Sequence, residues 1–280
     1  MEKFTFKLEG PIFQDGVPLH LAIKAWDNFQ SVIDKTYLVA TESHRIGAKE
    51  RDRYYLKAIN FEHSSFLTNF EIFLAGTQLA LPLLGVLGPQ NLWQYTRETF
   101  NFLKLICTQQ EQDSPSLKID VQDNQNTIVH IGDTVQNFNG PVFQIAEKAL
   151  PKYQDLAHML EQGKIEKISA GEKRNPEIVL SLSDKNLFDF PTKVQDDPIE
   201  VNCEIFTFNK FNNVGKLRVV DGQAIPSGDY SFSISGDQNN VNYIYSMLQP
   251  LVTVQCLLEF AISPLGAELI SHLHITGIIS

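Results

Sequence analysis

The feature that most constrains this chain is a break in its hydrophobic pattern between Ser183 and Pro198. The helical and strand periods weaken there, and the stretch contains two prolines and a pair of adjacent aspartates. Such a composition is typical of a linker, and 280 residues are enough for two domains. The sequence therefore predicts one domain over residues 1–183, a linker over 184–198 and a second domain over 199–280.

The first domain is predicted to mix helices with β-hairpins. Phe4, Phe6 and Leu8 alternate with polar residues, which indicates a half-buried strand, and apolar residues at three- and four-residue steps predict a helix from Pro18 to Ala40. Two further hairpins are expected, one with arms at 55–61 and 66–74 and one with arms at 117–121 and 127–131. Further helices are expected at 78–84, from Pro89 onward, and at 141–160, where Pro151 is expected to interrupt the helix. Two strands are expected at 165–169 and 177–182.

The second domain is predicted to be a small β-barrel. Its expected elements are strands at 201–208, 215–220 and 229–235, a short helix at 239–248, and longer strands at 251–262 and 267–279. Three strands, a helix and two strands are the order of an OB-like barrel, and an SH3-like barrel is the alternative. The predicted fold class is therefore α+β, with a mixed N-terminal domain followed by an OB-like or SH3-like barrel.

The charge of the chain bears on its partners. The formal net charge is −10, from 23 basic and 33 acidic residues, which works against general attraction to nucleic acid or anionic lipid. The apolar run Leu79–Leu87 is too short to span a bilayer, and the opening MEKFTFKLEG lacks the apolar core of a signal peptide. We therefore expect no membrane association and a cytoplasmic location.

The three cysteines point to a reducing compartment. Cys107, Cys203 and Cys256 are far apart in sequence and form no CxxC motif. An odd, sparse set does not make a disulfide framework, so we expect buried, reduced thiols.

Standard catalytic motifs are missing from the chain. It contains no GxGxxG or GxxxxGK[ST] loop, no GxSxG, no HExxH and no paired Cys/His spacing. We therefore expect no cofactor, and a binding role is favoured over an enzymatic one.

One candidate metal site lies on the last expected strand. His272 and His274 are two residues apart, so their side chains point to the same face, and Glu268 is expected on that face too. Two exposed polar residues, with Leu273 and Ile275 pointing inward, are the simpler explanation.

A basic segment is the candidate anion-binding site. Its cations occupy a short stretch and are Arg45, Lys49, Arg51, Arg53 and Lys57. Such a run binds an anion or a phosphate backbone, although a solvated loop is the simpler reading.

Two further groups of residues support alternative functions. Asp120, Asp123 and Asp133, in or beside the second hairpin, suggest a divalent ion for phosphodiester cleavage, although Asp123 also suits a turn. Phe206 and Phe208 are expected to share one face of a barrel strand. Because residues 199–280 are acidic, core packing is favoured there over base stacking.

A strongly apolar stretch over residues 78–88 is the candidate interface. Buried helix is the default reading, and exposure would make it an oligomer contact. Its candidate interface residues are Leu79, Leu83, Leu84, Val86 and Leu87.

Three segments carry a resemblance to a known group. The opening FKLEG strand, the long helix with Trp26 and the hairpin ending FEIFLAG resemble a bacterial two-domain family with a strand–helix–hairpin N-terminal part and a small C-terminal barrel. That family has no assigned function, so the resemblance supplies no catalytic residues. It implies association with bacterial multi-gene systems, including antiviral ones.

These observations lead to three functional hypotheses. The first is a non-catalytic binding or assembly protein, acting as sensor, adaptor or scaffold in a bacterial multi-protein system such as antiviral defence, with a protein partner or as a homo-oligomer. The second is a metal-dependent phosphodiester hydrolase or nuclease. The third is a binder of an anionic ligand or nucleic acid through the segment Arg45–Lys57.

Overall fold

The computed structural model describes residues 3–62, 66–75, 79–81, 85–111, 117–122, 126–220, 222–262, 265 and 268–279. The chain divides into two compact units, unit 1 at Met1–Asp189 and unit 2 at Phe190–Ser280. The expected linker, 184–198, contributes to both. Leu187 and Phe188 are buried side chains of unit 1, and β11 (Thr192–Val194) is a strand of unit 2. The α+β class is confirmed.

Unit 1 is built on an antiparallel sheet of five strands in the order β10-β9-β1-β3-β2. The strands are β1 (Phe4–Glu9), β2 (Tyr54–Glu62), β3 (Phe66–Leu74), β9 (Lys167–Gly171) and β10 (Pro176–Ser181). The predicted alternation in β1 is confirmed, because Phe6 and Leu8 are fully buried while Lys7 reaches the surface and pairs with Glu9. The sheet therefore has one apolar and one polar face.

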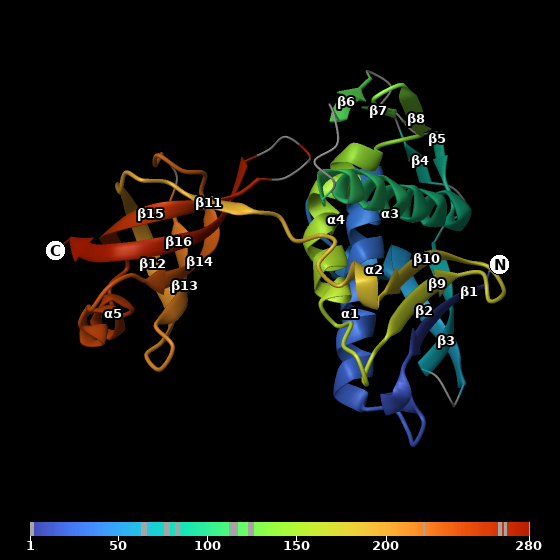
Figure 1. The fold of residues 1–280 in the computed structure, drawn as a ribbon, viewed down its shortest axis with the longest axis horizontal. Coiled ribbons are helices and arrows are strands. Elements are labelled where there is room, and N and C mark those ends of the chain that lie inside the picture. The colour runs from blue at the N-terminus through green and yellow to red at the C-terminus, as the bar shows by residue number, and fades with distance from the viewer. Residues whose placement is uncertain are drawn as a thin grey trace. The chain divides into compact units, whose positions relative to one another are not determined.

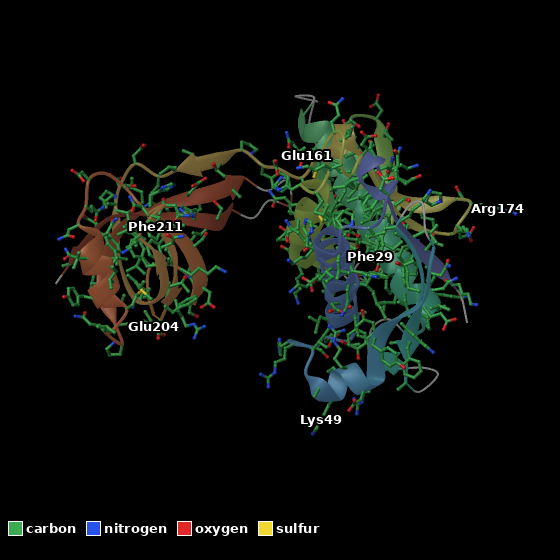
Figure 2. All side chains as sticks on the ribbon, turned by 90° about the horizontal axis from the view of Figure 1, so that it is seen from below. Phe29, Lys49, Glu161, Arg174, Glu204 and Phe211 are labelled. Atoms are coloured by element: carbon green, nitrogen blue, oxygen red, sulfur yellow. The ribbon has the colours of Figure 1, made fainter. Side chains whose placement is uncertain are left out.

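Helices cover the apolar face of this sheet (Figure 1). The helices α1 (Leu19–Ala40) and α3 (Pro89–Glu111) contribute Phe29, 4.4 Å from Phe6 between ring centroids, and Trp93, 4.7 Å from Phe4. Figure 2 labels Phe29 within this core. Helix α4 (Val142–Ala157) packs on α1 and α3, and Tyr153 donates a hydrogen bond to the Thr96 carbonyl at 3.0 Å.

Four local features of unit 1 differ from the expectation. Helix α4 runs through Pro151 without interruption, because Leu150 and Tyr153 are buried on either side and hold the turn in place. The expected helix at 78–84 is wrong for its described part, since β4 (Leu79–Leu81) pairs with β5 (Gly85–Leu87) as a hairpin. The hairpin β6 (Leu117–Val121) and β7 (Thr127–Ile131) gains a third strand, β8 (Thr134–Phe138), and a short helix α2 (Ala48–Arg53) precedes β2.

Unit 2 is a closed barrel of five strands with the predicted order. The elements are β12 (Ile199–Asn209), β13 (Val214–Val219), β14 (Gly228–Ile234), α5 (Asn240–Ser246), β15 (Val252–Ile262) and β16 (Glu268–Ile279). Strand β16 lies between β15 and β14, parallel to β14, and β15 returns to β12, so the ring closes. The three-strand, helix, two-strand order of an OB-like barrel is confirmed. Strand β11 adds beside β15.

The barrel core is apolar and one end is filled by rings. Tyr243 of α5 lies 5.3 Å from Phe208 and 6.2 Å from Phe232 between ring centroids. Gly215 is required here, because an added Cβ would lie 2.3 Å from the Thr207 carbonyl oxygen and 2.6 Å from the Phe232 ring.

The expectation that Phe206 and Phe208 share a face is wrong. The β12–β13 register shifts between Ile205 and Thr207, and this bulge reverses the alternation of side chains. Phe208 therefore packs against the core, as expected, while Phe206 is exposed beneath the guanidinium of Arg218.

No helix within the described ranges is long and apolar enough to cross a bilayer.

Candidate functional site

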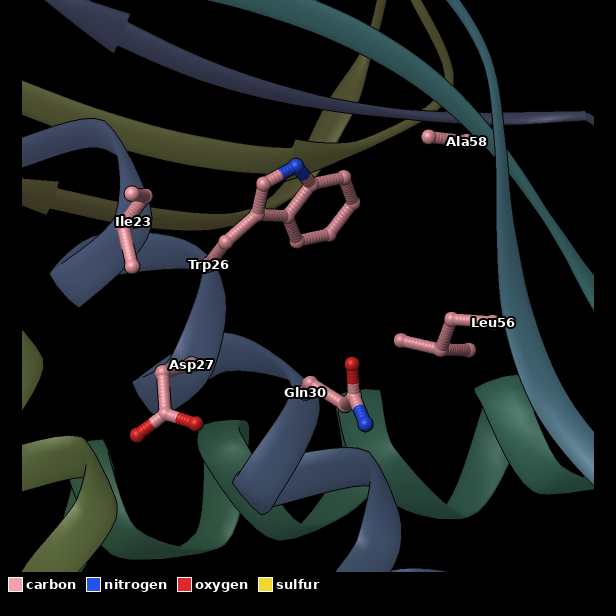
Figure 3. Close-up of a pocket in the computed structure, with 6 residues that line it drawn as sticks. All are labelled: Ile23, Trp26, Asp27, Gln30, Leu56 and Ala58. Atoms are coloured by element: carbon pink, nitrogen blue, oxygen red, sulfur yellow. The ribbon is translucent and has the colours of Figure 1, made fainter. Parts of the chain in front are cut away.

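The candidate site is a hollow between α1 and β2, which we call the α1–β2 groove. It has a volume of about 350 Å³. Its lining residues are Ile23, Trp26, Asp27 and Gln30 of α1 with Leu56 and Ala58 of β2. Figure 3 shows the indole of Trp26 reaching from the helix toward the strand, with Ile23 beside it and Leu56 opposite Gln30.

Trp26 is a rigid wall of this groove. Its ring stacks on Phe6 at 5.2 Å between centroids and meets Phe70 edge-on at 5.7 Å. Phe29 lies 5.8 Å away on the same helix. Since these three partners are buried core residues, one side of the indole is fixed while the other side faces the hollow.

Three polar groups on or beside the Trp26 ring have no hydrogen-bond partner among the described residues. Among the described residues, the indole Nε1 of Trp26, the amide of Gln30 and the carboxylate of Asp27 make no hydrogen bond or ion pair. The hollow therefore combines apolar surface with one N–H donor, one amide and one negative charge. This is the composition of sites that orient a ligand by a few polar contacts.

The strand beside the groove is an edge of the sheet. Strand β2 pairs with β3, and the described residues contain no other strand beside it. An edge strand presents unpaired backbone N–H and C=O groups along its length. A bulge between Ala58 and Asn60 bends it, which limits the straight edge to the part beside Trp26.

Large apolar side chains are exposed on the helix side of the groove. Leu19 and Ile23 have 70% and 59% of their surface exposed, and with Trp26 they follow one face of α1. Ala22, Ala25 and Phe29 of the same helix are buried, so the apolar surface of α1 extends from the core into solvent.

The basic segment is partly neutralised. The guanidinium of Arg51 donates to both carboxylate oxygens of Asp34, with an Nη1–Oδ1 distance of 3.0 Å. Lys49 projects from α2 (Figure 2), Arg53 is also exposed on α2, and Lys57 lies on β2 opposite Glu71. Arg45 lines a hollow of about 280 Å³ together with Asp34. The anion-binding hypothesis therefore retains Arg45, Lys49, Arg53 and Lys57 as exposed cations, and nothing in the structure tests it.

The histidine pair points outward from the barrel, as expected. Leu273 and Ile275 are fully buried, and the rings of His272 and His274 are 5.0 Å apart between centroids. The described residues contain no group of three His, Cys, Asp or Glu side chains placed to hold a metal ion. The side chain of Glu268 lies outside the described residues. The carboxylate beside His274 is Glu259, at 2.7 Å between Oε2 and Nε2.

The remaining candidates are only partly described. Asp120 lies within 3.3 Å of both Lys118 and His130, while Asp123 lies outside the described residues. Backbone positions are described for Leu79, Val86 and Leu87 in the β4–β5 hairpin, but their side chains, with all of Leu83 and Leu84, lie outside the described residues.

Leu56, Ala58 and Glu259 could not be recognised as site residues from the sequence alone. Their partners are distant in the chain, and only strand pairing brings them together. One signal was available, because the apolar stripe of α1 includes Leu19, Ile23 and Trp26.

Comparison with family models, curated proteins and solved structures finds no match to this chain.

Proposed function

We propose that this chain is a binding and assembly protein whose α1–β2 groove holds an extended segment of a partner polypeptide without catalysing a reaction on it. One observation carries the proposal. A fixed tryptophan pocket lies directly beside the outer edge of β2, which pairs with no other strand in the part of the chain that the structure describes. Peptide-binding domains that add a strand to a sheet use this combination of backbone pairing and side-chain pockets.

In this proposal each part of the groove has its own role. The edge of β2 pairs with the backbone of the incoming strand, and an apolar side chain of that strand fills the space between Ile23 and Trp26. The indole N–H of Trp26 donates to a carbonyl, and Asp27 attracts a basic residue. A peptide that is apolar at one position and basic beside it therefore suits the groove better than an acidic or nucleic-acid ligand.

The cellular setting follows from the resemblance and not from the fold. We propose a bacterial cytoplasmic multi-protein system, with antiviral defence as the example, in which the chain acts as sensor, adaptor or scaffold. A second copy of this chain, pairing through its own β2, is the alternative occupant.

Selection from a random peptide library on the immobilised full chain tests the proposal. Enriched peptides are expected to share an apolar residue next to a basic one. In fluorescence polarisation with a selected peptide, Ile23→Asp should weaken binding at least tenfold, because it removes apolar surface and places a charge where the apolar side chain of the peptide is expected to pack.

The matched control is Val135→Asp, an exposed valine of β8 in the same unit. It makes a similar apolar-to-acidic change away from the groove and should leave the affinity within twofold. If enriched peptides bind Ile23→Asp as tightly as the original chain, the α1–β2 groove is not their binding site. If the chain dimerises with increasing concentration and Ile23→Asp abolishes this dimerisation, a second copy of the chain is the favoured occupant.

A further inference from the structure

The outer wall of the barrel carries a row of polar side chains from three adjacent strands. Strand β14 contributes Ser231 and Ser233, β16 contributes His272 and His274, and β15 contributes Glu259. Ser233 lies opposite His274 in the parallel β14–β16 pair, and Glu259 lies opposite His272 in the β15–β16 pair. The register therefore brings together residues that are far apart in sequence.

Hydrogen bonds join these side chains into one unbroken series. His274 Nε2 is 2.7 Å from Glu259 Oε2, and His274 Nδ1 is 3.1 Å from Ser233 Oγ. The same Ser233 oxygen is 3.0 Å from His272 Nε2, and His272 Nδ1 is 3.1 Å from Ser231 Oγ.

One assignment of protons satisfies every bond in the series. An ionised Glu259 accepts from His274 Nε2–H, so His274 Nδ1 is unprotonated and accepts from the Ser233 hydroxyl. Ser233 then accepts from His272 Nε2–H, and His272 Nδ1 accepts from Ser231. Each imidazole is neutral, and Ser233 donates its proton to a base oriented by a carboxylate.

The charge states agree with this assignment. A hydrogen bond from the Thr192 hydroxyl and the contact with His274 hold the pKa of the Glu259 carboxyl below its ordinary value, against the opposing effect of partial burial. Burial and the neighbouring His274 lower the pKa of His272, although Glu259 opposes them. Both effects keep Glu259 ionised and His272 neutral at pH 7.

We propose that Ser233, His274 and Glu259 form a second site with a nucleophilic serine that accepts acyl groups from activated carboxylic esters. The arrangement is the one that nucleophilic catalysis requires, a hydroxyl hydrogen-bonded to a base that is itself oriented by a third group. The site lies on the barrel and is independent of the binding role proposed for unit 1.

The reaction balances with these groups alone. As the Ser233 oxygen attacks the ester carbonyl, its proton passes to His274 Nδ1, and the bond to the leaving oxygen breaks as that oxygen takes the proton from His274. Water then attacks the acyl-serine by the same route, which releases the carboxylic acid and restores Ser233. The Nε2–H of His272, already directed at the serine oxygen, is placed to donate to the developing oxyanion.

Labelling of the full chain with a fluorophosphonate probe, followed by peptide mass mapping, tests this assignment. We expect a single adduct on Ser233 that is absent in Ser233→Ala. His274→Gln should slow its formation about 100-fold through loss of the base, and Glu259→Gln about tenfold. Hydrolysis of 4-nitrophenyl acetate should follow the same ranking.

Exposed Ser227 on the same unit is the matched control, because none of these side chains bonds to it. It should remain unlabelled, and Ser227→Ala should react like the original chain. Thermal melts of each variant, followed by circular dichroism, separate loss of reactivity from loss of folding. No adduct on the folded chain, equal labelling of Ser227 and Ser233, or an unchanged rate in His274→Gln would overturn the proposal.

Discussion

The two units solve the problem of strand edges in opposite ways. Unit 1 has an open sheet in which β2 pairs with one strand among the described residues, whereas the strands of unit 2 close into a ring. An open edge offers backbone groups to a partner, and a closed ring withholds them. The groove that we propose for a peptide therefore lies on unit 1, whereas the nucleophilic site that we propose on unit 2 uses side chains alone.

The largest expected effect separates the cores of the two units. Phe29→Ala removes a ring that contacts Phe6, Phe70 and Trp26, and should destabilise unit 1 by about 3–5 kcal/mol. Both tryptophans, Trp26 and Trp93, belong to unit 1, so the urea midpoint of tryptophan fluorescence should fall.

Phe211→Ala is the control for this change, since the ring is 89% exposed and its loss should not move the fluorescence midpoint. Hydrogen exchange in barrel peptides should also be unchanged in Phe29→Ala. If barrel peptides exchanged faster in Phe29→Ala, the two cores would unfold as one cooperative structure, contrary to this prediction.

A smaller effect is expected from Gly215→Ala in the barrel. The added methyl group has no room against the Thr207 carbonyl and the Phe232 ring, and such overpacking costs about 1–3 kcal/mol. Hydrogen exchange should rise in barrel peptides while tryptophan fluorescence stays constant.

Gly277→Ala is the counterpart on β16, where an added Cβ meets nothing within 4 Å. It should change stability by no more than about 0.5 kcal/mol. If both glycine variants behave alike, close packing at Gly215 is not what the closed barrel depends on.

A further, modest loss of stability is expected from a change at Asp184, near the end of unit 1. Burial alone would raise the pKa of Asp184, but hydrogen bonds from Ser181 and the ammonium of Lys104 outweigh it and hold that pKa below its ordinary value. Asp184→Asn should therefore cost unit 1 about 1 kcal/mol at pH 7.

The pH dependence of this cost has a definite sign. A lowered pKa stabilises the folded state above the ordinary carboxyl value, and this stabilisation disappears as the pH falls through the lowered pKa. The difference in urea midpoint between Asp184→Asn and the original chain should shrink below about pH 4. A difference that stays constant down to pH 2 would show that the charge of Asp184 is not responsible.

Elements with strong local patterns could be predicted from the sequence. The stripe of α1, the alternation in β1 and the strand order of the barrel follow from periods within short windows. The hairpin formed by Leu79–Leu81 and Gly85–Leu87 could not be predicted, because apolar residues without a clear period suit a buried helix and a hairpin equally. Helix α2 could not be predicted either, because it has no buried residue and therefore shows no hydrophobic period.

The sites were harder to predict for a different reason. His272 and His274 were found because they lie on one strand, but Glu259 and Ser233 reach them through the pairing of three strands. The pocket at Trp26 likewise depends on a helix and a strand about thirty residues apart. Register between distant segments is the information that a single sequence does not carry.

The three buried thiols can be used to measure how often the structure around each of them opens. Burial, together with the neighbouring Cys256, raises the pKa of the Cys203 thiol to about 12. Burial raises the pKa of the Cys256 thiol to about 11. Neither cysteine therefore forms the reactive thiolate while the barrel is closed. Cys107 is buried in unit 1. The alkylation rate of each cysteine therefore reports how often the structure around it opens. A single reagent measures opening in both units without an engineered label.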